Sequence, residues 1–277
     1  MFKEYWRADI LMNITMLGTG NALVTECYNT CFILSNAGGN LLVDAGGGNR
    51  ILHQLKHAGF TLQDIHSVFI THQHIDHLLG VVWLIRITAQ LMNKGTYDDD
   101  LHIYSHDEVI PLLHYLVNKL LLPYQAAFVG TRIHLHTVSD AQTIRLIGQD
   151  FTFFDIHSAR TKQYGFRMLY GGKVLTCYGD EPCHRETEHY AEGADWILHE
   201  AFCLHSEAET FKPYEKHHST VKDAASLAQR LGVKNLLLYH TEDSDLTHRK
   251  ERYTSEARQY FCGNVYVPDD LETLALL

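Results

Sequence analysis

Three histidines and an aspartate lie close together in the segment FITHQHIDHLLG (69–80). His72 and His74 are two residues apart, so in an extended segment their rings point to the same side. Asp76 and His77 follow where the chain enters a helix, which turns a second pair toward the same space. Imidazole and carboxylate groups are suitable ligands for Zn²⁺, Mn²⁺ or iron. We therefore expect this segment to form part of a metal site.

Most of the 20 histidines in the chain must have ordinary roles. A single histidine is more often a surface residue or a hydrogen-bonded core residue than a metal ligand. That interpretation suits His53, His57, His114, His205 and His248, and also the HxH formed by His134 and His136, which has no acidic partner behind it. It does not suit the cluster at 72–77, because three imidazoles around one carboxylate repel each other when they are protonated.

Four polar residues each follow a short apolar strand, in the patterns VFIT-H, FTFFDI-H, VLTCYG-D and NLLLY-H. They are His72, His157, Asp180 and His240. In α/β folds the loops at such strand ends gather along one edge and carry the functional residues. Together with the cluster at 72–77, they supply more donor groups than one tetrahedral ion accepts. Two metal ions are therefore the expected number.

The remaining pattern alternates short apolar strands with helices and predicts an α/β fold with mixed sheets. Strands are expected at 13–18, 31–35, 40–48, 66–72, 101–105, 132–137, 143–147, 151–157, 165–170, 173–180, 194–202 and 235–240. Helices are expected at 49–60, 83–92, 107–122 and 221–231. Because no repeat or linker-like segment divides the chain, we expect residues 1–277 to form one domain. Inserted helical material at about 86–135 is expected to form a wall or lid over the site.

The composition limits the class of partner. The formal net charge is −10, from 33 acidic and 23 basic residues, which disfavours a large nucleic-acid substrate. The longest apolar runs, such as 80–85, fall well short of the roughly 20 residues that cross a bilayer, so no membrane association is expected. The start MFKEYWRADILMN (1–13) does not have the pattern of a signal peptide, which favours a cytoplasmic protein. The six cysteines form no CxxC pair and are expected to be reduced thiols.

Several motifs together resemble those of the metallo-β-lactamase superfamily. They are, in order, MLGTGNA (16–22), LLVDAGGG (41–48), THQHIDHLLG (71–80), CYGD (177–180) and LLLYH (236–240). The ribonuclease Z-like branch is the most similar, through HSARTKQYGFRM (157–168), LHEAF (198–202) and HHST (217–220). This resemblance covers nearly the whole chain. It implies a four-layer αββα sandwich of two mixed β-sheets flanked by helices.

The resemblance also implies a ligand set for two divalent metal ions, expected to be Zn²⁺, with Mn²⁺ or Fe as alternatives. It assigns His72, His74 and His157 to one ion and Asp76, His77 and His240 to the other, with Asp180 bridging both. We expect Asp76 to orient the attacking hydroxide as well. His218 resembles the family's proton donor, and Glu200 would hold its imidazole. His217 is the competing donor, and either histidine would alternatively cap the helix beginning at Ser219.

The substrate is predicted from a departure from the family pattern. Ribonuclease Z enzymes carry a long arm that grips tRNA between the residues matching His157 and Asp180, whereas only residues 158–179 separate them here. We therefore expect a hydrolase of a small phosphodiester, such as a cyclic nucleotide. A lactonase or carboxylic-ester hydrolase is the alternative, and tRNA 3′ processing is a weaker one. A structural or metal-sensing site is the non-enzymatic hypothesis, and the apolar helices also allow a homodimer.

Overall fold

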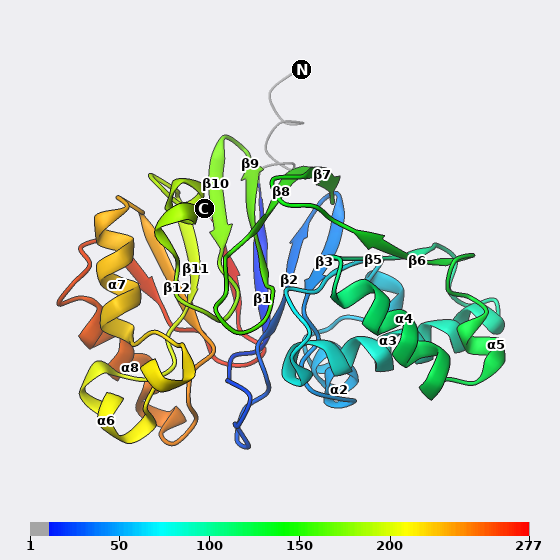
Figure 1. Ribbon diagram of the computed structural model, residues 1–277, viewed down its shortest axis with the longest axis horizontal. Coiled ribbons are helices and arrows are strands. Elements are labelled where there is room, and N and C mark those ends of the chain that lie inside the picture. The colour runs from blue at the N-terminus through cyan, green and yellow to red at the C-terminus, as the bar shows by residue number, and fades with distance from the viewer. Residues whose placement is uncertain (1–10, 277) are drawn as a thin grey trace.

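The structure, a computed structural model, describes residues 11–276 and shows two β-sheets packed against each other with helices on both outer sides (Figure 1). This arrangement confirms the predicted four-layer αββα sandwich. Residues 1–10, which include most of the segment interpreted as lacking a signal peptide, lie outside the described residues.

The first sheet has seven strands in the order β14-β1-β2-β3-β4-β5-β6. Its members are β1 (Asn13–Gly18), β2 (Cys31–Asn36), β3 (Gly39–Val43), β4 (Ser67–Phe69), β5 (Leu101–Ser105), β6 (Ile133–Thr137) and β14 (Thr273–Ala275). The pairs from β14 to β3 are antiparallel, and the pairs from β3 to β6 are parallel. The sheet is therefore mixed, as the sequence predicted.

The second sheet also has seven strands, in the order β13-β12-β11-β10-β9-β8-β7. They are β7 (Thr143–Leu146), β8 (Gln149–Asp155), β9 (Tyr164–Tyr170), β10 (Lys173–Cys177), β11 (Trp196–Glu200), β12 (Asn235–Tyr239) and β13 (Asn264–Tyr266). Strands β7 to β10 pair antiparallel, and β10 to β13 pair parallel. The predicted hairpin at Gly171 and Gly172 is the β9–β10 connection, where both glycines have positive φ.

The helices divide between the two outer faces. On the first sheet lie α2 (Arg50–His57), α3 (Ile75–Asn93), α4 (Val109–Leu120) and the short α5 (Pro123–Ala126), and the second half of the chain forms α6 (Ala208–Phe211), α7 (Val221–Arg230) and α8 (Leu246–Ala257). Single 3₁₀ turns lie at Leu62–Asp64, Arg185–Tyr190, His205–Glu207 and Tyr214–Lys216. Thr220 caps α7 in a capping box with Asp223, so neither His217 nor His218 is the cap.

Three apolar layers hold the sandwich together. One lies between the first sheet and α2, α3 and α4, and another between the second sheet and α7 and α8. The middle layer fills the space between the sheets with aromatic residues such as Phe69, Phe153 and Phe166. The ring centroids of Phe153 and Phe166 lie 4.7 and 5.9 Å from the ring centroid of Phe69. Alternation along each strand sends successive side chains into different layers, which is why the strand patterns were readable from the sequence.

Helix α3 continues through Gly80 without a break. It starts at Ile75, close to where Asp76 and His77 were expected to enter a helix, and Gly80, beyond which the helical region at 83–92 was expected, lies in its interior. A side chain at residue 80 would collide with the backbone of Ala45, so this glycine permits close packing rather than a break. Among the described residues α3 is also the helix with the length and composition of a membrane span, but 61% of that stretch is buried in the protein. Burial of this kind is typical of a core helix.

The inserted segment at 86–135 lies over the first sheet. Its α4 packs on β5 and β6, and Val109, Leu113 and Val117 of this helix enter the outer apolar layer. Because the apolar face of α4 packs against the sheet, the segment lies along one side of the sandwich within a single chain.

Candidate metal centre

Six of the seven predicted metal ligands meet at one end of the sandwich, between the two sheets. From the first sheet, His72 follows β4, His74 is the N-cap of α3, and Asp76 and His77 lie in the first turn of α3. From the second sheet, Asp180 follows β10 and His240 follows β12. The ligands therefore come from two facing sheets, whereas the sequence suggested neighbouring strands along a single edge.

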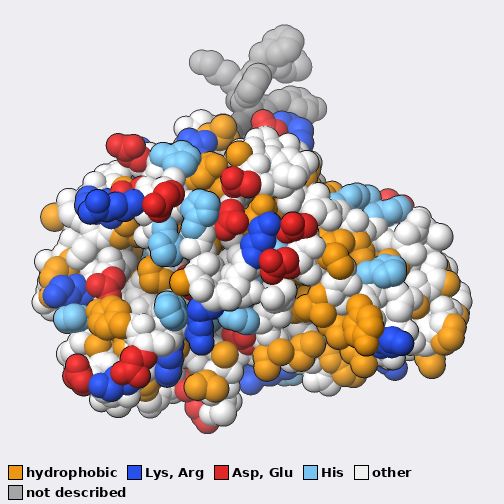
Figure 2. Space-filling model, in the orientation of Figure 1, with side chains coloured by type: hydrophobic (Ala, Val, Ile, Leu, Met, Phe, Trp, Pro, Cys, Tyr) orange, Lys and Arg blue, Asp and Glu red, His pale blue; other side chains and the backbone are white. Residues whose placement is uncertain are grey.

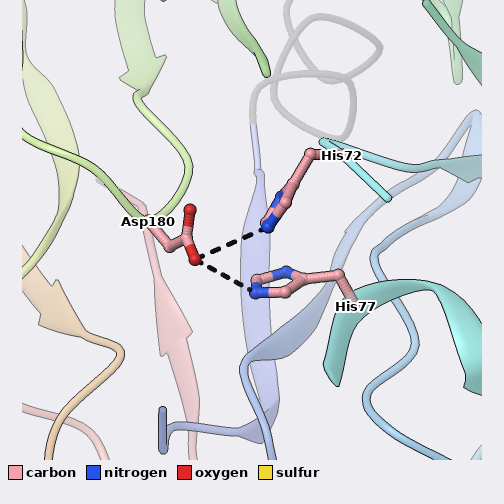
Figure 3. A group of neighbouring side chains, drawn as sticks. All are labelled: His72, His77 and Asp180. Carbon is pink, nitrogen blue, oxygen red and sulfur yellow. Dashed lines mark ion pairs between the residues drawn. The ribbon is translucent and has the colours of Figure 1, made fainter. Parts of the chain in front are cut away.

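Asp180 lies at the centre of the arrangement. Its Oδ2 atom is 3.6 Å from His72 Nε2, 3.5 Å from His77 Nε2 and 3.5 Å from His240 Nε2. Figure 3 shows the Asp180 carboxylate reaching from its loop toward the rings of His72 and His77. One carboxylate oxygen is therefore within reach of ligand atoms from both sheets.

The remaining ligand atoms flank this oxygen on two sides. On one side His72 Nε2 is 2.8 Å from His74 Nδ1. On the other side Asp76 Oδ2 is 3.4 Å from His77 Nε2 and 3.8 Å from His240 Nε2. Two groups of potential ligands, which meet at His77, are thus close enough to hold a cation: His72, His77 and Asp180, and Asp76, His77 and His240.

Unpartnered polar atoms show that these residues fit divalent metal ions. His77 Nε2, Asp180 Oδ1 and both ring nitrogens of His240 are buried and have no hydrogen-bond partner among the described residues. Leaving such atoms unpaired costs free energy, so a buried cation is the partner that this set of nitrogen and oxygen donors fits.

The charges of the cluster also suit cations. Burial lowers the pKa of His72 well below its usual value, which leaves this ring neutral with a lone pair available. Burial opposes ionisation of Asp180 as well, but His72, His77 and His240 together hold the pKa of its carboxyl well below the usual range. The centre therefore presents the charged carboxylate of Asp180 beside the neutral ring of His72.

Asp44 supports this centre and was not assigned a role from the sequence. It follows β3, has a positive φ of 55° and accepts a 2.7 Å hydrogen bond from His77 Nδ1. It also accepts hydrogen bonds of 2.8 Å from the backbone N–H and the hydroxyl of Thr71. A carboxylate on the far nitrogen of a ligand histidine fixes its tautomer and ring orientation. The motif LLVDAGGG, in which Asp44 follows an apolar strand, was the available signal.

His157 is the predicted ligand that the structure places outside the cluster. Its side chain is exposed, its φ is +59°, and its backbone N–H donates to Asp155 Oδ1 at 2.8 Å. The loop that follows is anchored by buried Glu181, which accepts hydrogen bonds from Ser158 Oγ at 2.8 Å and from the Ala159 N–H at 3.3 Å. This anchoring holds the loop beside the centre, and a ligand role for His157 stays a prediction.

His218 and Glu200 lie next to the cluster. His218 Nδ1 donates to the Asp180 carbonyl oxygen at 2.8 Å and lies 3.6 Å from Glu200 Oε2. Glu200 is fully buried and also accepts a hydrogen bond from the Ser219 N–H. His217, the competing candidate, is exposed and lies in a left-handed turn with a φ of 60°. The arrangement favours His218 as the histidine that reaches the site.

A cavity of about 370 Å³ opens onto the cluster. Its lining residues are Ala22, Gln73, His74, Ile75, Asp76, Arg160, Asp180, Glu181, His218 and His240. None of these comes from 86–135, so the described part of a single chain does not show the predicted lid over the site. Arg160, which the sequence did not single out, is the one Lys or Arg residue of this lining, and its Nη1 donates to the Lys216 carbonyl oxygen at 3.0 Å.

Comparison with known families decides the relationship. Residues 12–261 match the family described as anti-Pycsar protein Apyc1. The chain belongs to this family. The match includes every strand of the two sheets except β13 and β14, and it includes all seven candidate metal ligands.

The chain is also similar to curated relatives and to solved structures. A ribonuclease Z of Thermococcus onnurineus (strain NA1) is 25% identical, and the alignment covers 95% of this chain and 94% of the relative. The metallo-β-lactamase fold protein YhfI from Bacillus subtilis has a TM-score of 0.77 at 20% identity, over 96% of this chain and 99% of that one. A diphosphatase from the PhnP family has a TM-score of 0.73 at 20% identity, and the match covers 96% of this chain and 97% of that one.

These findings confirm the predicted ribonuclease Z-like branch and the metallo-β-lactamase fold. The Apyc1-family protein is accordingly a metal-dependent hydrolase with a divalent-metal centre built from histidine and aspartate.

Proposed function

We propose that this protein is a phosphodiesterase with two metal ions, acting on a small phosphodiester such as a cyclic nucleotide. The observation that carries the proposal is the position of Asp180, whose Oδ2 lies 3.5 to 3.6 Å from His72, His77 and His240 at the base of the cavity. A carboxylate oxygen this close to histidines of both ligand groups suits a pair of ions that lie close together.

The ligand assignment follows from the two sides of Asp180. His72 and His74, with His157 as the remaining predicted ligand, would hold one ion, and Asp76, His77 and His240 would hold the other. We expect Zn²⁺, and Mn²⁺ or Fe would suit the same donors. When bound, a pair of divalent ions supplies a water of lowered pKa and positive charge for the phosphoryl oxygens.

Different residues of the chain would then act on the attacking water and on the leaving oxygen. Asp76 lies beside His77 and His240 and lines the cavity, so its carboxylate is placed to accept a hydrogen bond from the attacking water and orient it. His218 has its Nδ1 proton fixed on the Asp180 carbonyl oxygen, which leaves Nε2 to donate a proton to the leaving oxygen. Glu200 positions His218 from the buried side.

Two features support a small substrate. The β9–β10 hairpin occupies almost all of the chain between His157 and Asp180, so the described structure has no arm at the position where ribonuclease Z enzymes carry one. The cavity, about 370 Å³, lies at the lower end of the 300 to 1,000 Å³ typical of small-molecule sites. Relatives named ribonuclease Z and a diphosphatase of the same fold point to phosphorus–oxygen bonds as the ones broken.

We also infer that the protein assembles as a homodimer. Apolar residues are exposed on α3, on α4 and just beyond it: Trp83, Tyr115, Leu120, Leu122 and Tyr124. Figure 2 shows hydrophobic side chains gathered over this side of the molecule. Exposed apolar patches of this kind are typical of protein interfaces.

A substrate panel with the Zn²⁺-loaded protein tests the proposed activity. Cyclic nucleotides and bis(p-nitrophenyl) phosphate should be hydrolysed, whereas an acyl lactone and a tRNA precursor should not. Asp180→Asn should abolish the turnover, because the ligand shared by both ions is lost. Faster turnover of the lactone would favour the ester hydrolase, and faster cleavage of the tRNA precursor would favour 3′ processing. Absence of turnover on every substrate would favour a structural or sensing site.

A further inference from the structure

A second group of histidines lies away from the cavity, on strands β5 and β6 at the edge of the first sheet. Along β5, Leu101 and Ile103 face the outer apolar layer, so His102 and Tyr104 face the opposite side. Tyr104 packs at the margin of the layer between the sheets, and His102 continues the same face beyond it. Figure 2 shows histidine side chains exposed on the side of the molecule where β6 lies.

Strand pairing brings three imidazoles together on this face. His102 is the cross-strand partner of His134, and their rings stack with centroids 5.0 Å apart. His136 lies two residues further along β6, so it has the same orientation as His134. His102 Nδ1 and His136 Nε2 are only 3.0 Å apart. We call His102, His134 and His136 the edge histidines.

An acidic residue completes the group, contrary to the expectation that the HxH of β6 has no acidic partner. Asp100 Oδ2 is 2.8 Å from His134 Nε2, and its other oxygen accepts a 3.1 Å hydrogen bond from Arg132 Nε. The sequence could not show this partner, because Asp100 directly precedes β5, which pairs with β6. The contact with Asp100 helps to fix the ring of His134.

His102 and His136 are available as ligands near neutral pH. Burial lowers the pKa of His102 and of His136, and the neighbouring imidazoles lower both further. Neutral rings keep their lone pairs, and all three side chains are only partly buried, so ions in solution can reach them.

We propose that the edge histidines bind one late first-row divalent metal ion, such as Zn²⁺, Ni²⁺ or Cu²⁺, between His102 Nδ1 and His136 Nε2. Two nitrogens at about 2.0 to 2.1 Å from a tetrahedral ion lie roughly 3.3 Å apart, so the 3.0 Å pair has to open by only a few tenths of an ångström. When the metal binds, the proton of the hydrogen bond between these two nitrogens moves to the other nitrogen of the ring that carries it. His134, whose Nε2 is held by Asp100, stacks on His102 beside the ion, and water fills the remaining positions.

This site is separate from the catalytic centre. None of its residues belongs to the ligand groups of that centre or lines the cavity. Strands β5 and β6 form a continuous parallel pair, which holds the two ligand side chains in a fixed relation. The proposal therefore stands whether or not the proposed phosphodiesterase activity is correct.

Counting bound metal on the full chain tests the proposal. After the catalytic centre has been loaded, equilibrium dialysis against Zn²⁺ should show one further equivalent on the wild-type protein. His136→Ala and His102→Asn should weaken this additional binding by at least about tenfold, a loss that even outer-shell changes cause. Both variants should keep the unfolding temperature and the hydrolase activity of the wild type.

His114→Ala is the matched control, because His114 is exposed on α4 and contacts only Asn118 through its ring. It should retain the additional equivalent. The Cu²⁺-loaded wild type should also give an electron paramagnetic resonance spectrum with coupling to two or more imidazole nitrogens at the added ion. Equal metal content in the wild type and His136→Ala, or no equivalent beyond the catalytic centre, would overturn the proposal.

Discussion

His218 is held by contacts that suit a proton donor. Its Nδ1 donates to the Asp180 carbonyl oxygen, and its ring stacks on Phe202 with centroids 4.8 Å apart and an interplanar angle of 13°. Burial acts against a charged ring, but Glu200 and Asp180 raise the pKa of His218 above its usual value. The ring thus has a fixed orientation and favours the form that has a proton to give.

Replacing His218 should therefore slow substrates according to their leaving group. We expect His218→Ala to lower kcat by about 10²- to 10⁴-fold for a cyclic nucleotide, because its leaving alkoxide needs a proton. Bis(p-nitrophenyl) phosphate should lose much less, because p-nitrophenolate leaves without one. His217→Ala is the control and should keep kcat for both substrates. An equal loss on both substrates in His218→Ala would indicate that the residue only maintains the fold of the site.

Inference about single residues worked best where several potential metal ligands lie close together in the sequence. The dense cluster at 72–77 has no good packing explanation, and the structure brings it together with Asp180 and His240. Asp44, Glu181 and Arg160 were not assigned roles, because one polar residue beside a strand or in a loop looks the same whether it supports a ligand or faces water. His157 follows an apolar strand as the other candidate ligands do, but the loop after it is tied to Glu181, so its ligand role stays a prediction.

At the scale of elements, helix α8 joins the loops around the metal centre through Arg249. This side chain is 3% exposed, and its Nη1 donates to Thr19 Oγ1 at 3.0 Å and to Thr241 Oγ1 at 2.9 Å. Its Nη2 donates to the Pro268 carbonyl oxygen at 3.0 Å. Thr19 follows β1 of the first sheet, and Thr241 follows the ligand His240 of the second. The guanidinium of Arg249 therefore ties a loop of the first sheet to the loop of the second sheet that carries His240.

Arg249→Lys should loosen these loops, because one ammonium group cannot reproduce the fork of donors. We expect the free energy of unfolding to fall by about 2 to 4 kcal/mol, since several buried hydrogen bonds to a charged donor are lost. Affinity for metal should fall as well, as measured by chelator competition. Arg252→Lys, whose ion pairs on the same helix are more exposed, should change stability by less than about 1 kcal/mol. Equal effects of the two substitutions would contradict the role of Arg249.

Most of the expected strands agreed with the structure within a few residues, because alternating burial leaves a clear period of two. The continuity of α3 through Gly80 was missed, since the close approach of Ala45 to Gly80 is invisible in sequence. Helix α8 and the short strands β13 and β14 were not predicted. The lid expected at 86–135 instead flanks the first sheet, because the apolar face of α4 is used against β5 and β6.

At the scale of the whole molecule, the chain forms its two sheets almost consecutively. The first takes its strands from 13–137 with β14 added at the end, and the second takes its strands from 143–266. The sequence predicted two packed sheets but not their strand orders, since strand pairing depends on contacts distant in the chain. The candidate ligands lie where the sheets meet and come from both of them, so bound ions would crosslink the two halves.

Metal removal should for that reason lower global stability as well as activity. A ligand present at about 100 times its Kd stabilises the folded state by about 2.7 kcal/mol, so treatment with a chelator should lower the Tm by several degrees. Calorimetry of metal-loaded and chelated protein measures this shift, and adding Zn²⁺ back should reverse it. Asp180→Asn should show a much smaller difference between the two states, because it lacks the carboxylate shared by both sheets. An unchanged Tm in the chelated wild-type protein would mean that no ion links the two halves.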